Sequence, residues 1–237
     1  MIRAVVFDLD DTLISEKKYI KSGYQYISKI LSARYDKDAQ ELYQLLFKLF
    51  NESPHNVFNR ILDKMGISYT KNDILEMVEE YRDHLPDIEF FDDVLPCLKE
   101  LKKKNIKIGV ITDGYATAQR QKLKVIKATN FFDEIIVTDE LGREYWKPHP
   151  KAFEMMKEKL NVEFNEMIYV GDNPEKDFYI SSIYPTETIR IYRDGVYRDR
   201  KYLYNIKENH SIHCLSELKL ILEQERIHSS CGEISKI

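Results

Sequence analysis

The sequence contains few cysteines, and their positions form no pattern. Only three are present, Cys97, Cys214 and Cys231, and they are odd in number and far apart along the 237 residues. This usage argues against a disulfide framework and against a cysteine-rich zinc site. We therefore expect three reduced thiols with structural or incidental roles.

The sequence also lacks an excess of charge and a long apolar run. The net charge is −4, from 36 basic and 40 acidic residues, which does not indicate a nucleic-acid surface. No apolar stretch is long enough to span a bilayer, and the opening residues, Met1-Ile2-Arg3, lack the apolar segment of a signal peptide. We expect a cytoplasmic protein, monomer or homodimer, without membrane or nucleic-acid partners.

Short apolar runs alternate with helical patterns through much of the chain. Buried strands are expected at residues 2–7, 106–111, 135–137, 167–170 and 188–191. Amphipathic helices are expected at 95–104, 116–127 and 150–160, and a last helical pattern includes Leu215, Leu218, Ile221 and Leu222. Alternation of this kind implies crossover connections and a parallel sheet, so the predicted fold class is α/β.

One long stretch near the N-terminus has helical spacing only. From about residue 15 to residue 86, apolar residues recur at helical intervals, as in Leu42, Leu45, Leu46 and Leu49. We expect a helical module here, inserted after the first strand. The predicted division is a core of residues 1–14 and 92–237 and a helical insertion of residues 15–91. The links near 14–18 and 87–92 should act as hinges.

Asp8 and Asp10 lie where the first strand ends. Side chains in a strand repeat every second residue, so both carboxylates project from the same face. Two like charges this close cannot both stay ionised cheaply without a cation between them, unless one carboxyl stays protonated. The alternative is a turn in which Asp11 caps a helix and the other two aspartates are solvated.

Further polar residues come after, or shortly before, two other predicted strands. In chain order they are Thr112, Asp113, Gly114, Lys147, Asp172 and Asp177. An open parallel sheet binds its ligands outside the carboxyl ends of its strands. We therefore expect these groups to gather with Asp8 and Asp10 at one edge of the sheet.

This set of side chains suits phosphoryl transfer. Carboxylate oxygens suit Mg²⁺, which prefers one or two carboxylates together with water and phosphate oxygens. The Thr112 hydroxyl, the backbone N–H groups of the turn at Asp113 and the Lys147 ammonium can donate to a phosphoryl oxygen. Asp8 can then attack as a carboxylate nucleophile, and Asp10 can protonate the leaving oxygen.

The order and spacing of these residues resemble the four motifs of the haloacid dehalogenase-like (HAD) hydrolase superfamily over most of residues 1–195. The matching residues are Asp8-x-Asp10-x-Thr12, Thr112, Lys147 before Pro148, and Gly171-Asp172 followed by Asp177. The resemblance implies a Rossmann-like parallel sheet core with helices on both faces. It also implies an inserted all-helical cap of the C1 type, which closes over the site and selects the substrate.

The resemblance further implies a role for each motif residue. Asp8 would carry an aspartyl-phosphate intermediate, and Asp10 would act as general acid and base. Thr112, Asp113 and Lys147 would contact the phosphate of the substrate.

The metal site is implied in the same way. Mg²⁺ would be held by the carboxylates of Asp8 and Asp172 and by the main-chain carbonyl of Asp10. Thr12 would contact the metal ligands without binding the metal itself. Asp177 would either do the same or be an added ligand. Residues 178–185 depart from the small residues and glycine that relatives usually carry there, which concerns how closely the following helix packs.

These observations predict a phosphatase acting on a small phosphorylated metabolite. An aspartate two residues after the nucleophile can protonate an alkoxide leaving group, whereas a halide leaves without a proton, so Asp10 favours phosphoryl transfer. A phosphomutase, a 2-haloacid dehalogenase of the same fold and a non-catalytic phosphate-binding regulatory module are the alternatives that stay open.

Overall fold

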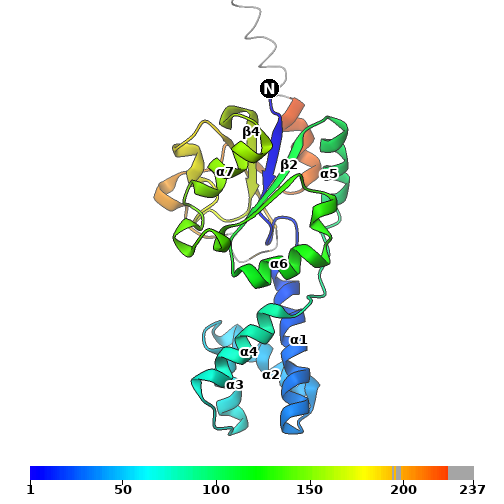
Figure 1. Cartoon of the computed structure of the whole chain (residues 1–237), viewed down its shortest axis with the longest axis vertical. Helices are drawn as coiled ribbons and strands as arrows, with labels where there is room; N and C mark the ends of the chain where they lie inside the picture. The colour runs from blue at the N-terminus through cyan, green and yellow to red at the C-terminus, as the bar shows by residue number, and fades with distance from the viewer. Residues whose placement is uncertain (194, 196–198, 224–237) are drawn as a thin grey trace, which may run out of the picture.

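The computed structural model describes residues 1–193, 195 and 199–223. They form a parallel sheet flanked by helices and, below it in Figure 1, a separate group of four helices, here called the helical bundle. The N-terminus lies at the end of the sheet that is far from the bundle. No helix in the described part of the chain is both long and apolar enough to cross a membrane.

Six parallel strands form the sheet, in the order β3-β2-β1-β4-β5-β6. Their bounds are β1 Ala4–Phe7, β2 Lys107–Thr112, β3 Glu134–Val137, β4 Met167–Gly171, β5 Glu187–Ile191 and β6 His210–Ile212. The first five confirm the expected strands. The sixth was missed because His210, Ser211 and Ile212 make too short and too polar a run to be seen in the sequence. The strand order reverses between β1 and β4, which is where sheets of this class bind ligands.

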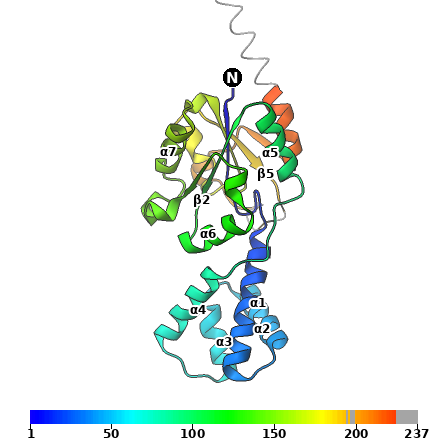
Figure 2. The same cartoon turned by 45° about the vertical axis from the view of Figure 1, so that its right-hand side comes forward.

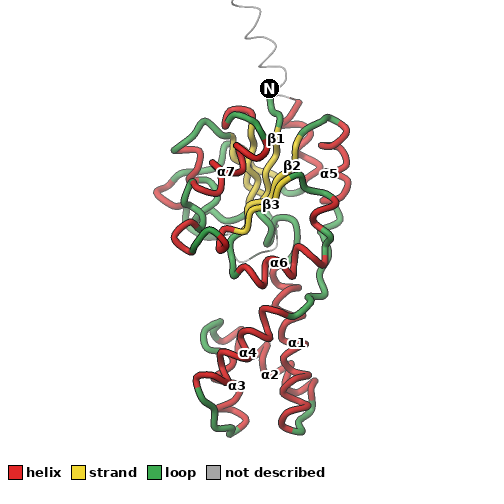
Figure 3. Tube along the Cα trace, viewed as in Figure 1, coloured by secondary structure: helices red, strands yellow, loops and turns green. Residues whose placement is uncertain are grey.

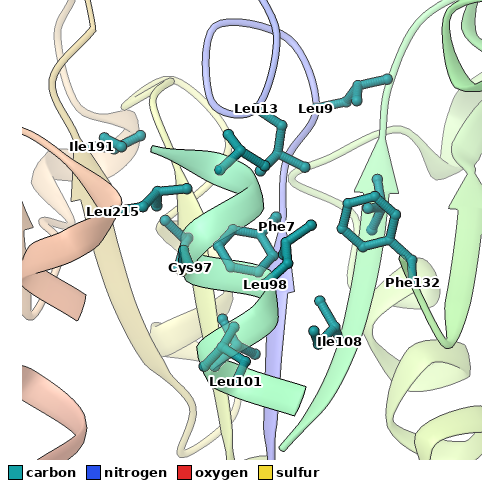
Figure 4. Close-up of a cluster of buried hydrophobic side chains, with 14 of the residues drawn as sticks. Phe7, Leu9, Leu13, Cys97, Leu98, Leu101, Ile108, Phe132, Ile191 and Leu215 are labelled. Atoms are coloured by element: carbon teal, nitrogen blue, oxygen red, sulfur yellow. The ribbon is translucent and has the colours of Figure 1, made fainter. Parts of the chain in front are cut away.

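Helices cover both faces of the sheet. They are α5 Val94–Lys103, α6 Ala116–Val125, α7 Lys151–Leu160 and a helical segment at 218–223. Alternate residues of β1 serve the two faces: Val5 and Phe7 pack with α5 and α6, while Ala4 and Val6 pack with α7 (Figure 4 shows the first cluster). The predicted α/β class is therefore confirmed.

Short 3-10 turns fill several connections of the sheet part. They are η1 Ala128–Asn130, η2 Thr138–Glu140, η3 Arg143–Tyr145, η4 Phe164–Glu166, η5 Tyr179–Ser182, η6 Leu203–Asn205 and η7 Leu215–Glu217. The described connection from β4 to β5 contains only η5 and no α-helix, in the segment whose sequence had called close packing of a following helix into question. Ser181 and Ser182 donate their hydroxyls to the carbonyls three residues earlier, at 2.8 and 2.7 Å, and Pro185 follows. Both features disfavour a continued α-helix.

The helical bundle comprises α1 Glu16–Tyr35, α2 Ala39–Glu52, α3 Val57–Met65 and α4 Lys71–Asp83 (Figure 3). The Ser15 side chain caps α1, and Thr70 and Asp73 form a capping box at α4. The bundle has its own apolar core, in which Leu46 and Met77 are almost fully buried. Gly23 of α1 lies against the ring of Tyr81, so a larger side chain there would collide with it.

Two chain segments connect the sheet to the bundle, and they run side by side. The Phe91 N–H donates to the Leu13 carbonyl at 3.0 Å, and Ile14 forms an antiparallel bridge with Phe90. The guanidinium of Arg193 donates to the Thr12 carbonyl at 3.2 Å and forms an ion pair with Asp93 at 2.8 Å. Arg193, which follows β5, therefore contacts both connecting segments near the carboxyl ends of the strands.

The thiols of Cys97 and Cys214 are free, as expected, and burial raises the pKa of Cys97 to about 12. The prediction for Cys231 lies outside the described residues.

Candidate active site

Asp8 and Lys147 form a buried ion pair at the carboxyl end of β1. The Lys147 Nζ lies 2.5 Å from the Asp8 Oδ1, 2.8 Å from the Asp177 Oδ1 and 2.7 Å from the Tyr169 hydroxyl. Burial lowers the pKa of Lys147, but the charges of Asp177 and Asp8 outweigh it and raise that pKa well above its usual value. Lys147 is therefore a fixed positive charge beside the predicted nucleophile.

Three carboxylates converge at this point. Asp8, Asp172 and Asp177 each bring one oxygen to within 4.8 Å of the others, and all three are buried. Burial raises the pKa of Asp8 to about 6, against the influence of Lys147. Burial and then repulsion from Asp8 and Asp177 raise the pKa of Asp172 well above its usual value. Hard oxygen donors that repel one another fit a divalent cation such as Mg²⁺.

Gly171 allows Asp177 to approach the cluster. A Cβ at Gly171 would lie 2.5 Å from the Asp177 Oδ2, so only glycine leaves room for that carboxylate. The Asn173 N–H donates to the same oxygen at 2.9 Å. Asp177 is thus held by Lys147 on one oxygen and by backbone on the other, deeper than Asp172.

The carboxylate of Asp10 points toward α6. Its two oxygens accept from the Lys122 Nζ at 2.7 and 2.8 Å, and one of them accepts from the Gln119 amide at 2.9 Å. Lys122 is almost fully buried, with its ammonium 4.2 Å from the centre of the Tyr19 ring of α1. Neither α6 residue was predicted from the sequence, although their spacing of three places them on one helix face after Thr112-Asp113-Gly114.

Thr112 is the last residue of β2 and Asp113 follows it, and the side chains of both form hydrogen bonds within the protein. The Thr112 hydroxyl accepts from the Gln119 amide at 2.5 Å. The Asp113 carboxylate accepts from the Thr138 hydroxyl at 2.7 Å, the Lys147 backbone N–H at 3.1 Å and the Lys176 ammonium at 2.9 Å. Asp113 therefore fixes both lysines.

Lys176 was not predicted. It follows Glu175 in the loop between Asp172 and Asp177, and a basic residue beside the last motif is the only signal that could have pointed to it. Its pKa is raised, because the charges of Asp113 and Asp8 outweigh burial and the repulsion of Lys147.

Thr12 is fully buried, and its hydroxyl has no hydrogen-bond partner among the described residues. Its carbonyl accepts from Arg193, so the structure shows Thr12 in contact with the segment after β5.

Two cavities meet at these residues. The small cavity, about 180 Å³, is lined by Asp8, Asp10, Asp172, Lys176 and Trp146, among others. The large cavity, about 460 Å³, lies between the helical bundle and α6. Asp10, Glu16, Asp113 and Gly114 line both, so the two cavities adjoin. The small one is the size of a phosphate site, and the large one could hold the rest of a substrate.

Comparison with known proteins identifies the family. The model of the haloacid dehalogenase-like hydrolases matches residues 5–182. A glyceraldehyde 3-phosphate phosphatase of Methanopyrus kandleri is 32% identical over 206 residues, which cover 84% of this chain and 87% of that protein. The pyrophosphatase PpaX of Bacillus mycoides is 27% identical over 224 residues, covering 94% of this chain and 98% of that protein.

A solved structure agrees with these matches. The crystal structure of a HAD phosphatase from Thermococcus onnurineus superposes with a TM-score of 0.60 at 27% identity, covering 93% of this chain and 98% of that one. The predicted resemblance is thereby confirmed. This chain belongs to the haloacid dehalogenase-like hydrolases, in their phosphatase branch.

Proposed function

We propose that this chain is a Mg²⁺-dependent phosphatase that hydrolyses small phosphate monoesters through an aspartyl-phosphate on Asp8. The observation that carries the proposal is the buried Asp8 carboxylate, 2.5 Å from the Lys147 Nζ and lining a cavity with Asp172 and Lys176. The names of the relatives, which are phosphatases and a pyrophosphatase, support the same chemistry.

Asp8 and Asp172 would hold the metal, with Asp177 beside them and the Asp10 carbonyl as a further ligand, as the family resemblance implies. When bound, Mg²⁺ would neutralise the carboxylates and the charge of the phosphoryl group. The ligand atoms of Asp8, Asp172 and Asp177 lie within 4.8 Å of one another, which supports this assignment. Without a cation, Lys147 alone would balance two of these carboxylates.

The phosphoryl group would lie in the small cavity. Lys147 would orient Asp8 for attack, and Lys176, held 2.9 Å from Asp113, would supply positive charge to the phosphoryl oxygens. Asp113 and Gly114 line the same cavity, and the backbone N–H groups of their turn would donate to those oxygens. The Thr112 hydroxyl, which precedes this turn, would donate to the same phosphoryl oxygens.

Asp10 would move the protons of the reaction. It would protonate the oxygen of the departing alcohol and later accept a proton from the water that attacks the aspartyl-phosphate. Lys122 and Gln119 would set the position from which its carboxylate turns toward that oxygen. Asp8 would be regenerated when water attacks phosphorus.

The domain division belongs to the same proposal. Residues 1–14 and 92–237 would form the catalytic core, and residues 15–91 a C1-type cap that opens and closes over the site. The separate apolar core of the helical bundle and its contacts with α6 support this division. We also propose a cytoplasmic location, because the free thiols of Cys97 and Cys214 suit a reducing compartment.

The test is turnover of p-nitrophenyl phosphate with Mg²⁺ and with a chelator present. We expect wild-type protein to release p-nitrophenol only with the metal, and Asp8→Asn to lose at least about a thousandfold in kcat while its circular dichroism stays unchanged. Turnover that persists in Asp8→Asn would exclude the assigned nucleophile. Metal-independent halide release from chloroacetate would favour the dehalogenase alternative instead.

A further inference from the structure

The large cavity contains a cation without a counter-ion. Arg82, at the C-terminal end of α4, lines this cavity together with Tyr115. Among the residues that the structure describes, no carboxylate lies within 4.0 Å of the Arg82 guanidinium, and no hydrogen bond to it is formed. The guanidinium is a planar fork of hydrogen-bond donors that is more weakly hydrated than an ammonium, so its location at a cavity favours an anionic ligand.

An aromatic ring fixes the position of this guanidinium. The Arg82 Cζ lies 3.3 Å from the centre of the Tyr115 ring, and the Arg143 Cζ lies 4.5 Å from the same centre. Tyr115 comes directly after the turn at Gly114, which lines both cavities. The stack therefore links α4 of the helical bundle to the loop that borders the phosphate site (Figure 2 shows α4 beneath α6). The attraction between a cation and the face of an aromatic ring holds the guanidinium at this wall of the cavity.

The three lysines of this region already have carboxylate partners. The Lys122 ammonium is bound to Asp10 at 2.7 Å, and the Lys176 ammonium is bound to Asp113 at 2.9 Å. Lys147 is bound to Asp8 and Asp177. Arg82 is therefore the cation lining the large cavity that has no carboxylate partner within the described part of the chain.

Glu16 lines both cavities where they meet, and burial raises the pKa of its carboxyl to about 7. An anionic group placed there would oppose ionisation of this carboxyl, which leaves the region beside Arg82 as the favourable place for one. The rings of Tyr19, Tyr81 and Tyr115 form much of the wall between these points.

We propose that the leaving group of the substrate carries a second oxyanion, a carboxylate or a phosphoryl group, and that Arg82 binds it above the Tyr115 ring. The proposal rests on the proposed phosphatase function and names its substrate class. Arg82 is then a specificity-determining residue contributed by the helical bundle, and esters with uncharged leaving groups are poorer substrates.

The experiment compares kcat/KM for phosphorylated compounds that differ in the charge of the leaving group. Phosphoglycolate supplies a carboxylate, pyrophosphate supplies a phosphoryl group, and glycerol 3-phosphate and p-nitrophenyl phosphate supply neither. We expect Arg82→Gln to lower kcat/KM for at least one anionic substrate by roughly 10- to 100-fold, as for loss of a hydrogen bond to a charged group. For the other two esters we expect a change below about threefold. The anionic ester with the larger loss identifies the kind of oxyanion.

Two further variants make the comparison specific. Arg82→Lys keeps the charge but loses the fork, so it should recover part of the lost activity. Arg34→Gln removes the same charge from α1, where Arg34 is 3.9 Å from Glu80 and outside the cavity, and it should leave the preference unchanged. Equal losses for charged and uncharged esters in Arg82→Gln, or no loss at all, would overturn the proposal.

Binding separates this proposal from the catalytic one. Calorimetric titration of Asp8→Asn with phosphoglycolate and with pyrophosphate should show, for at least one of them, affinity that falls about tenfold or more when Arg82→Gln is added, whether or not the wild type hydrolyses that compound. Unchanged affinity of the double variant for both compounds would contradict the role of Arg82. Absence of any Mg²⁺-dependent turnover by wild-type protein would instead contradict the proposed function and leave this binding result standing.

Discussion

The Lys147 ammonium lies 2.5 Å from the Asp8 carboxylate and 2.8 Å from that of Asp177, with no solvent exposure of the lysine side chain. One cation thus links the residue expected to attack phosphorus with Asp177, the carboxylate expected beside the metal ligands or as an added ligand. The ion pair keeps Asp8 in place, and it also makes the fold depend on a charge that the chemistry uses.

The first prediction concerns the stability that this lysine provides. Lys147→Ala leaves the buried carboxylates of Asp8 and Asp177 without the cation that pairs with them, so we expect the free energy of unfolding to fall by about 3–5 kcal/mol. Urea denaturation followed by circular dichroism measures this. Lys151→Ala is the matched control, since Lys151 is exposed four residues later and should change stability by less than about 0.5 kcal/mol. Equal stability of the two variants would show that the Asp8–Lys147 pair is not a structural element.

The second prediction concerns pH in metal-free solution. Burial raises the pKa of Asp8 from 3.8 to about 6, so the folded chain holds a proton there that the unfolded chain releases. Its contribution to stability is present below pH 4 and is lost as pH rises through 6. The gap between the two values corresponds to about 3 kcal/mol.

Comparing wild type with Asp8→Asn isolates this effect. Asparagine does not titrate. Between pH 4 and pH 7 the free energy of unfolding of the wild type should therefore fall by a few kcal/mol relative to that of the variant. Both proteins are unfolded with denaturant at each pH, in buffers that contain a chelator. A difference between the two proteins that does not change with pH would contradict the raised pKa of Asp8.

The third prediction concerns the position of Asp10. Lys122→Met removes the ammonium that lies 2.7 Å from the Asp10 carboxylate, so we expect kcat for p-nitrophenyl phosphate to fall about 10- to 100-fold while KM changes little. Lys124→Met changes an exposed lysine of the same helix and should leave kcat within about twofold. Equal kcat in wild type and Lys122→Met would show that α6 does not position the acid.

The fourth prediction concerns motion of the helical bundle. If residues 14–18 and 87–92 are hinges, closure over a bound phosphate mimic should slow amide hydrogen exchange in both segments. Orthovanadate with Mg²⁺ is a suitable probe, and exchange in β1 and β4 serves as the internal reference. The hinge assignment fails if exchange in the two segments is the same with and without the probe.

The sequence indicated the parallel sheet because its buried strands are continuous apolar runs, as in Val5 to Phe7 and Ile168 to Val170. Such runs are a local property that composition and periodicity reveal. The short edge strand β6 has no such run, and only its pairing with β5 through Ile189 and His210 defines it. The segment after Asp177 forms only a short 3-10 turn for a local reason, because the hydroxyls of Ser181 and Ser182 donate to backbone carbonyls.

The residues of the candidate site likewise fall into those that local sequence patterns predicted and those that they did not. Asp8, Asp172 and Lys147 belong to motifs whose spacing can be read along the chain, and the fold brings them together. Lys122 and Lys176 are ordinary lysines in sequence, and their importance comes from contacts with Asp10 and Asp113 across more than 60 residues. Contacts of that range depend on how helices pack, which periodicity does not encode.

The central claim is that Asp8 takes the phosphoryl group from the substrate. Rapid acid quench of the enzyme with a ³²P-labelled ester, followed by borohydride reduction and peptide mass spectrometry, tests it most directly. Reduction of an acyl phosphate converts aspartate to homoserine, so the account predicts homoserine at position 8 and at no other aspartate. Homoserine elsewhere, or steady turnover with no labelled enzyme at any quench time, would contradict it.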